Sequence, residues 1–151
     1  MRTVLVIDDD IEFREILSLM LLEAGCAVWE ASSTAEAFQI LDQENSFDYI
    51  FCDLHLPFTL GKDAEEYEYS EEVGIRTLSE LSTVYGDTVT LVALSAAEAI
   101  DRDLVRTRLG HKIPLLGKPI RSEVLEALVS SGEPQIPVSS AKLPWEDAFL
   151  M

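Results

Sequence analysis

The feature that most constrains the fold is a regular alternation of short apolar runs with longer segments of helical period. Four of the five runs are rich in β-branched or aromatic residues, as buried parallel strands tend to be. Right-handed connections between such strands build a parallel sheet covered by helices on both faces. The alternation therefore predicts an α/β domain, with strands at residues 3–7, 26–31, 47–52, 88–94 and 113–117.

Five helices are expected between and after these strands. Capping residues, apolar spacing and closing glycines place them at residues 11–24, 34–42, 71–86, 96–110 and 121–132. The first helix should face the core with a single apolar stripe, because residues three or four apart share one side of a helix. That stripe is expected to consist of Ile11, Ile16, Leu17, Met20, Leu21 and Ala24.

Two segments depart from the alternation. Residues 58–72 form a long acidic connection after the third strand, where loops of α/β proteins usually have about 2–6 residues. Residues 133–151 form a tail with three prolines, so we expect a domain at 1–132 followed by this tail. Trp145 and Phe149 would share a face on one helical turn. We expect that face to pack on an apolar groove, either of its own domain or of a second molecule. In the second case the protein would be a homodimer.

Composition narrows the class of protein. The chain has 151 residues, 48% of them apolar, which suits one domain with a hydrophobic core. The formal net charge of −17 argues against nucleic acid or an anionic membrane surface as a partner. Charged residues appear too early for a signal peptide, and no apolar run approaches the ~20 residues that span a bilayer. A cytoplasmic protein is therefore expected.

Three consecutive carboxylates, Asp8, Asp9 and Asp10, directly follow the first apolar run. Like charges at this spacing repel one another, so a positive partner is expected among them. Ligands of open parallel sheets bind at the carboxyl ends of the strands, where these residues would lie. Clustered carboxylates on rigid backbone suit a hard divalent ion, most often Mg²⁺.

Three further polar residues come at the ends of later strands. Asp53 directly follows the third apolar run, Ser95 the fourth and Lys118 the fifth. A carboxylate beside a divalent ion can attack phosphorus and form an aspartyl phosphate. Lys118 and Ser95 could then hold the added oxygens by charge and by a hydrogen bond. The sequence therefore predicts a site that accepts a phosphoryl group.

Four motifs occur in order at these strand ends: VIDDD at the first, DLHLP from Asp53 to Pro57, ALSA around Ser95, and GKP around Lys118. Together they resemble the receiver domain of response regulators in bacterial two-component signalling, over about residues 1–131. The resemblance implies a flavodoxin-like, doubly wound sheet of five parallel strands in the order 2-1-3-4-5.

That strand order separates the two cysteines, Cys26 and Cys52. They would lie two strands apart, roughly 9.6 Å at ~4.8 Å per strand, which is too far for a disulfide. Two buried free thiols are therefore expected.

The resemblance also implies a metal site. Asp9 would be the main Mg²⁺-binding acid, with Asp8 beside it acting through water. The phosphoacceptor Asp53 and the backbone carbonyl of His55 would complete the protein ligands. Asp10 is expected instead to cap the first helix, where the N-terminal dipole favours a carboxylate.

By the same resemblance, Asp53 receives a phosphoryl group from a histidine kinase or a histidine phosphotransfer protein, and the domain then acts on a downstream protein. Lys118 would pair with the phosphoryl group, and Ser95 would be the switch hydroxyl, followed by the small residue Ala96. The chain would be no enzyme beyond its own phosphotransfer and dephosphorylation. Leu115 departs from the family pattern because an aromatic residue usually stands there, three residues before the lysine.

Two alternatives remain open at this stage. A degenerate receiver would bind a partner without being phosphorylated, and Leu115 is the feature that favours it. A phosphatase of the haloacid-dehalogenase type would use Asp8 as nucleophile and Asp10 as acid/base. That reading leaves Asp53 without a role, and mapping of the phosphorylated aspartate distinguishes all three.

Overall fold

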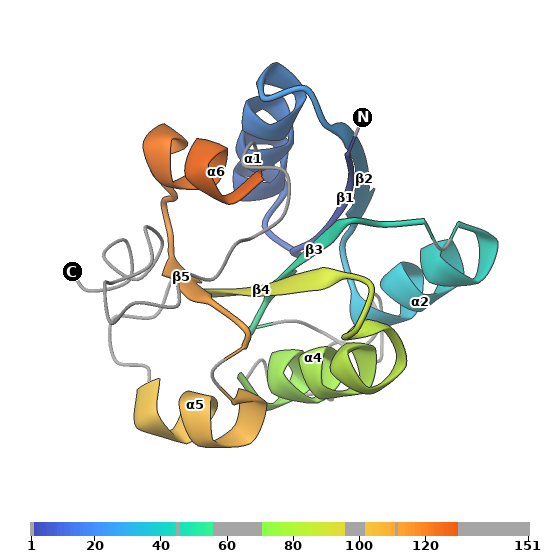
Figure 1. Ribbon diagram of the computed structural model, residues 1–151, viewed down its shortest axis with the longest axis vertical. Coiled ribbons are helices and arrows are strands. Elements are labelled where there is room, and N and C mark those ends of the chain that lie inside the picture. The colour runs from blue at the N-terminus through green and yellow to red at the C-terminus, as the bar shows by residue number, and fades with distance from the viewer. Residues whose placement is uncertain (1, 45, 56–70, 96–101, 111, 130–151) are drawn as a thin grey trace.

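The computed structural model describes residues 2–44, 46–55, 71–95, 102–110 and 112–129 (Figure 1). Strands and helices alternate along this part of the chain. The elements are β1 Thr3–Ile7, α1 Ile11–Glu23, β2 Ala27–Ala31, α2 Thr34–Gln43, β3 Tyr49–Asp53, α4 Glu71–Tyr85, β4 Thr90–Ser95, α5 Arg102–Leu109, β5 Leu115–Gly117 and α6 Ser122–Val129.

The five strands form one sheet in the order β2-β1-β3-β4-β5, and every neighbouring pair is parallel. The predicted fold class and strand order are confirmed. β3 and β4 each run one residue further than expected, so that Asp53 and Ser95 are the last residues of their strands. Cys26 and Cys52 are both buried and free, as the strand order requires.

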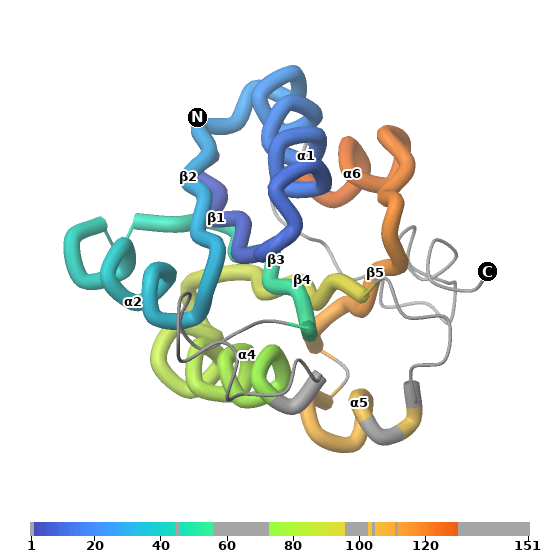
Figure 2. The backbone as a smooth tube through the Cα atoms, turned by 180° about the vertical axis from the view of Figure 1, so that it is seen from behind, coloured from blue at the N-terminus to red at the C-terminus, as the bar shows by residue number. Residues whose placement is uncertain are grey.

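Helices cover both faces of this sheet (Figure 1). α1 and α6 lie side by side on one face, and α2, α4 and α5 lie on the other, which is also visible from behind in Figure 2. Successive residues of β1 point to opposite faces. Val4 and Val6 pack with α1 and α6, whereas Leu5 and Ile7 pack with α2, α4 and α5. Both faces are buried, which explains why the strands read as continuous apolar runs.

The apolar stripe expected on α1 is wrong at two positions. Ile11 and Ile16 are 60% and 57% exposed, whereas Leu17 and Leu21 are buried. Successive residues of a helix are about 100° apart, so the side that buries Leu17 and Leu21 turns Ile16 toward solvent. Met20 is half-buried and packs at the edge of the core on this face.

Capping residues begin the helices, and glycines follow them, largely where the sequence indicates. Ser33 caps α2, and its Oγ accepts a hydrogen bond from the backbone N–H of Glu36 at 3.2 Å. Gly110 follows α5 with φ of +80°, a conformation that side chains disfavour and glycine adopts freely.

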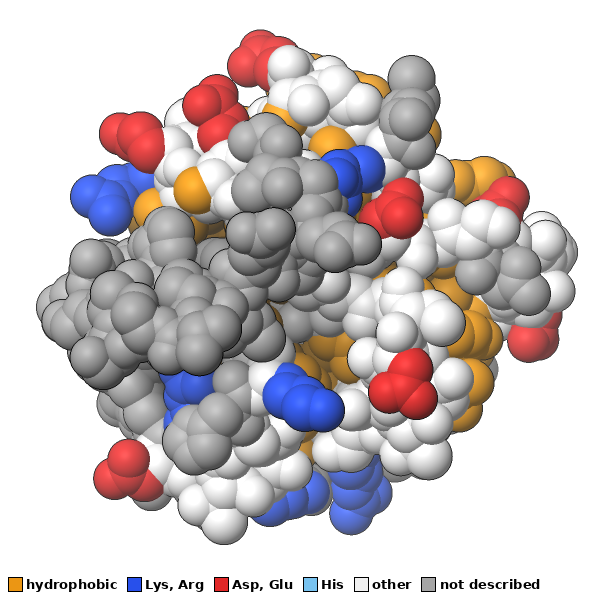
Figure 3. All heavy atoms as spheres, viewed as in Figure 1, with side chains coloured by type: hydrophobic (Ala, Val, Ile, Leu, Met, Phe, Trp, Pro, Cys, Tyr) orange, Lys and Arg blue, Asp and Glu red, His pale blue; other side chains and the backbone are white. Residues whose placement is uncertain are grey.

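Charge is distributed unevenly over the described surface. Exposed basic side chains occur on α4, on α5 and in the turn after α5, at Arg76, Arg108 and Lys112. In Figure 3 several Lys and Arg side chains lie over the lower part of the molecule, where α4 and α5 lie, and others lie in the upper half among the acidic side chains. The described parts of α4 and α5 therefore present exposed positive charge although the net charge of the chain is strongly negative.

Several predictions fall on residues outside the described part of the chain. They are the acidic connection, apart from residues 71 and 72 at the start of α4, the beginning of the helix expected at 96–110, and the tail at 133–151 with its expected contact. Among the described helices, none combines the length and the apolar character that a membrane span requires.

Candidate functional site

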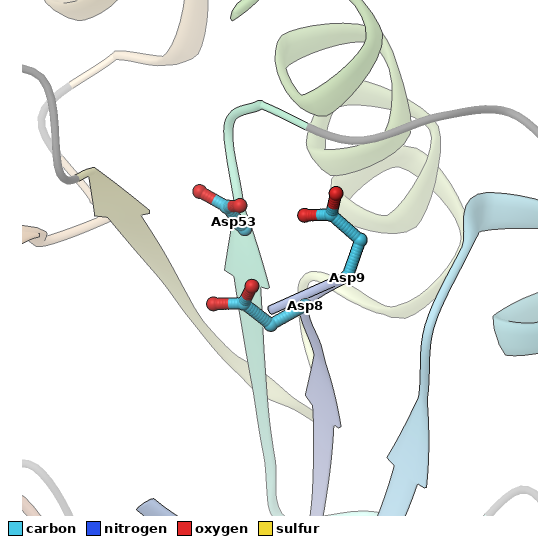
Figure 4. Close-up of side chains that lie close together, drawn as sticks. All are labelled: Asp8, Asp9 and Asp53. Atoms are coloured by element: carbon cyan, nitrogen blue, oxygen red, sulfur yellow. The ribbon is translucent and has the colours of Figure 1, made fainter. Parts of the chain in front are cut away.

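Three carboxylates converge at the carboxyl ends of the two central strands. Asp8 and Asp9 directly follow β1, and Asp53 is the last residue of the neighbouring β3 (Figure 4). One carboxylate oxygen from each of the three lies within 4.8 Å of the others. The predicted convergence of Asp8, Asp9 and Asp53 at one edge of the sheet is thus present in the structure.

Asp8 is fully buried and is compensated by an ion pair and a backbone hydrogen bond. Nζ of Lys118 lies 2.5 Å from Oδ2 of Asp8, and the backbone N–H of Asp10 donates to Oδ1 at 2.9 Å. A buried charge is costly unless it is paired in this way. The positive partner expected among the acids is therefore, in part, an ammonium group of the protein itself.

Lys118 also reaches the second buried carboxylate. Its Nζ lies 3.4 Å from Oδ2 of Asp53, whose Oδ1 accepts a hydrogen bond from the backbone N–H of His55 at 3.3 Å. The backbone N–H of Lys118 donates to the carbonyl of Ser95 at 2.9 Å, and the Lys118–Pro119 peptide bond is cis. These contacts tie the ends of β3, β4 and β5 to one position of the ammonium.

The site remains short of positive charge. Burial, followed by the charge of Asp8, raises the pKa of Asp53 to about 7, although Lys118 acts in the opposite direction. Burial and the charge of Asp8 also raise the pKa of Asp9. One ammonium for three clustered carboxylates leaves an excess of negative charge, and a cation binding there would favour the ionised forms.

Asp10, the last of the three consecutive acids after β1, caps a helix instead of joining the cluster. Asp10 is the N-cap of α1, and its Oδ1 accepts a hydrogen bond from the backbone N–H of Phe13 at 3.2 Å, as predicted. One turn along the helix, Nη1 of Arg14 donates to the carbonyl of Asp8 at 2.7 Å, and its Nε pairs with Glu30 at 2.9 Å. The start of α1 is thereby fastened to the end of β1.

Sequence reasoning missed one contact at the centre of the site. The Nζ atom of Lys118 lies 4.4 Å from the centre of the Phe13 ring. Phe13 sits at a core-facing position of α1, where an aromatic residue is ordinarily a packing residue. Only the folded arrangement, which brings the Lys118 side chain to the first turn of α1, distinguishes this ring from other core side chains.

Gly74 allows α4 to approach the end of β3 closely. The glycine lies inside the first turn of α4, where its N–H donates to the carbonyl of Leu54 at 3.0 Å. A Cβ at this position would come within 2.6 Å of the backbone oxygen of Asp53 and closer still to the backbone of Leu54. Only glycine fits here without a shift of the backbone that carries Asp53.

The remaining predicted residues lie at or near the same edge. Ser95 is buried at the end of β4, in register with Gly117. Leu115 is buried in β5 and packs on the α4 and α5 side of the sheet. His55 is half-buried directly after Leu54, whereas Ala96 lies outside the described residues.

Comparison with known proteins gives a family and a set of similar structures. The model of the response regulator receiver domain matches residues 4–130. No curated protein matches the sequence. A response regulator structure from Chloroflexus aurantiacus is 26% identical, with 82% of this chain and 90% of that one covered and a TM-score of 0.64.

Two further similar structures contain bound ligands. A response regulator from Burkholderia pseudomallei, with a phosphorylated aspartic acid, calcium and citrate, is 25% identical, with 84% of this chain and 65% of that one covered and a TM-score of 0.64. The response regulator TrrA from Thermotoga maritima, in complex with Mg(2+)-BeF, is 22% identical, with 86% and 97% covered and a TM-score of 0.65. With the family model matched over residues 4–130, the chain belongs to the response regulator receiver domains.

Proposed function

We propose that the protein accepts a phosphoryl group on Asp53 from a histidine kinase or a histidine phosphotransfer protein, with Mg²⁺ required, and signals by binding a downstream protein. The observation that carries this proposal is the position of the Lys118 ammonium, 2.5 Å from Asp8 and 3.4 Å from Asp53. A nucleophilic carboxylate, a cation and two further acids are thus gathered around one point.

The transfer exchanges one bond to phosphorus for another and needs no second substrate beyond the phosphoryl donor. An ionised oxygen of Asp53 forms a bond to phosphorus while the bond between phosphorus and the donor imidazole nitrogen breaks. The electron pair stays on the imidazole, which takes up a proton, and the phosphoryl group remains as an acyl phosphate. Because burial and Asp8 raise the pKa of Asp53 to about 7, a compensating cation is needed to keep the nucleophile ionised at neutral pH.

The residues present fit Mg²⁺. Asp8, Asp9 and Asp53 supply hard oxygen donors within 4.8 Å of one another. Apart from its ion pair with Lys118, Oδ2 of Asp8 is buried without a hydrogen-bond partner among the described residues. The ion would be held by these carboxylates with the backbone carbonyl of His55, and it would neutralise charge on the transferred phosphoryl group.

Lys118 and Ser95 are proposed to hold the phosphoryl oxygens after transfer. Lys118 already lies beside the nucleophile, and Ser95 ends the adjacent strand with its carbonyl bonded to the Lys118 N–H. Leu115 has no ring that could rotate with the state of Ser95. We therefore expect the signal to pass through the backbone around Ser95, with a smaller change than a rotating aromatic side chain would give.

In this proposal the receiver domain comprises residues 1–132, and the tail at 133–151 follows it. It acts in the cytoplasm and catalyses only its own phosphorylation and dephosphorylation. The phosphorylated aspartate of the Burkholderia relative and the Mg(2+)-BeF complex of the Thermotoga relative support the chemistry by analogy. The phosphatase alternative is disfavoured because Asp10, its required acid/base, caps α1 instead.

The proposal is tested with acetyl phosphate and Mg²⁺, followed by intact-protein mass spectrometry. Wild type should gain one phosphoryl group, whereas Asp53→Asn should gain none. Asp42→Asn, which changes an exposed carboxylate on α2, is the matched control and should behave as wild type. A folded wild-type protein that gains no phosphoryl group from acetyl phosphate or from a phosphorylated histidine donor would favour the degenerate receiver.

A further inference from the structure

The ammonium of Lys118 is enclosed on more than one side. Its distance of 4.4 Å from the centre of the Phe13 ring is within the ~6 Å over which a ring attracts a cation. The Lys118 side chain is only 10% exposed, although lysine usually keeps its charge in water. Asp8 and Asp53 pair with the same ammonium that the aromatic ring contacts.

The backbone that carries Phe13 is held in place by the acids themselves. The N–H of Phe13 donates to Oδ1 of Asp10, whose own N–H donates to Oδ1 of Asp8. Arg14, the next residue, binds the carbonyl of Asp8 at 2.7 Å. A short chain of hydrogen bonds therefore connects the buried partner of Lys118 with the residue whose ring lies against the same ammonium.

An ammonium between two carboxylates needs such a contact for a physical reason. Lysine has a flexible side chain and a strongly hydrated charge, so its contacts in the protein must offset the hydration that the buried ammonium gives up. A ring at this position attracts the charge electrostatically and also excludes water, and the attraction grows as the site becomes drier. A leucine in place of the ring would also exclude water, but it would not attract the charge.

We propose that Phe13 is a positioning residue, whose ring holds the Lys118 ammonium over Asp8 and Asp53 and thereby speeds phosphoryl transfer. This inference rests on the proposed phosphorylation of Asp53. The ammonium must move from Oδ2 of Asp53 toward an oxygen of the incoming phosphoryl group. A ring face lets the ammonium make this shift while it remains in contact and shielded from water.

The test compares variants that keep or lose the ring. Phe13→Leu should slow phosphorylation by acetyl phosphate roughly five- to tenfold at saturating Mg²⁺, while Phe13→Tyr and Phe13→Trp should stay within about twofold of wild type. Phe47→Leu removes a ring from the opposite face of the sheet, where it contacts Trp29, and should leave the rate unchanged. Circular dichroism confirms that each variant is folded.

A second measurement does not depend on phosphorylation. Protons of the Lys118 side chain that lie over a ring are shifted upfield in an NMR spectrum. The shift should be present in wild type and in Phe47→Leu, and absent in Phe13→Leu. Magnesium affinity, measured by calorimetry, should stay within about twofold of wild type in folded Phe13→Leu, because Phe13 offers no ligand atom.

The outcomes separate the inference from the proposed function. Equal phosphorylation rates in wild type and Phe13→Leu, or an equal loss in Leu, Tyr and Trp variants, would overturn the role of the ring. Absence of the upfield shift in wild type would overturn the contact itself. A wild-type protein that shows the shift but never accepts a phosphoryl group would refute the proposed function, and with it the positioning role of Phe13 in the transfer.

Discussion

The Nζ atom of Lys118 lies 3.4 Å from Oδ2 of Asp53, although 65 residues separate the two in the chain (118 − 53). The same ammonium pairs with Asp8, so one positive charge serves two buried carboxylates. Parallel strands bring these residues together because their carboxyl ends share one edge of the sheet. Both the stability of the domain and its chemistry should therefore depend on the charge balance at this point.

Removal of the ammonium should destabilise the protein. Lys118→Met leaves Asp8 and Asp53 buried without a counter-charge, and breaking a buried pair typically costs about 3–5 kcal/mol. We expect a loss of this order in the free energy of unfolding at pH 7.5, measured by urea denaturation. Lys112→Met, at an exposed position in the turn after α5, is the control and should change it by less than ~0.5 kcal/mol. Equal urea midpoints for the two variants would show that the ion pair is not formed.

The raised pKa of Asp53 predicts a pH dependence of stability. Folding moves this pKa from its usual value of 3.8 to about 7, so the folded state holds a proton that the unfolded state releases. The contribution of Asp53 is therefore fully present below pH ~4 and is lost as the pH rises through ~7. Without metal, Asp53→Asn should gain stability relative to wild type as the pH rises from 4 to 8.

The difference between the two proteins isolates Asp53, because the other groups titrate in both. It is measured by urea denaturation in the presence of a chelator at several pH values. A difference that stays constant over this range would mean that Asp53 titrates at its usual pKa in the folded protein.

Magnesium should stabilise the domain, and more so at high pH. Asp9 and Asp53 both have raised pKa values, so protons compete with the ion at these two ligands. We expect the melting temperature to rise with Mg²⁺ at pH 8 and to rise clearly less at pH 6. Differential scanning fluorimetry against a chelator measures this, with Asp9→Asn as the variant that should lose most of the effect. The same shift at both pH values would contradict it.

Much of this architecture could be predicted from the sequence, because each strand is a buried apolar run that ends in a polar residue. The order of the strands and the convergence of Asp8, Asp9 and Asp53 follow from that pattern and the family resemblance. The exposed side of α1 could not be predicted as well. Ile11 and Ile16 match a helical period, but the neighbouring β2 and α6 decide which arc of the helix is buried.

Contacts between side chains that are distant in the sequence were harder still to predict. The sequence suggested Mg²⁺ as the partner of the first acids, and nothing in it showed that Lys118 already pairs with Asp8. Phe13 has the spacing of an ordinary core residue, and its contact with that ammonium depends on where the fold places the Lys118 side chain relative to α1. Such contacts depend on the packing of elements rather than on any local pattern.

A methyl group at Gly74 should disturb the phosphoacceptor. The Cβ of Gly74→Ala would lie 2.6 Å from the backbone oxygen of Asp53, a contact that no side-chain rotation can relieve. Alanine favours a helix by about 1 kcal/mol over glycine, but overpacking against backbone costs roughly 1–3 kcal/mol or more. We expect a net loss of stability and slower phosphorylation, whereas Ser79→Ala in the same helix should change neither. A melting temperature above that of wild type would contradict this.

The central claim is that Asp53 accepts the phosphoryl group, and peptide mapping tests it most directly. The protein is incubated with acetyl phosphate and Mg²⁺, the acyl phosphate is reduced with borohydride, and the modified aspartate is located by mass spectrometry. The charge arrangement around Lys118 predicts modification at Asp53 alone, abolished by a chelator. Modification at Asp8, or none in a folded and Mg²⁺-loaded protein, would contradict it.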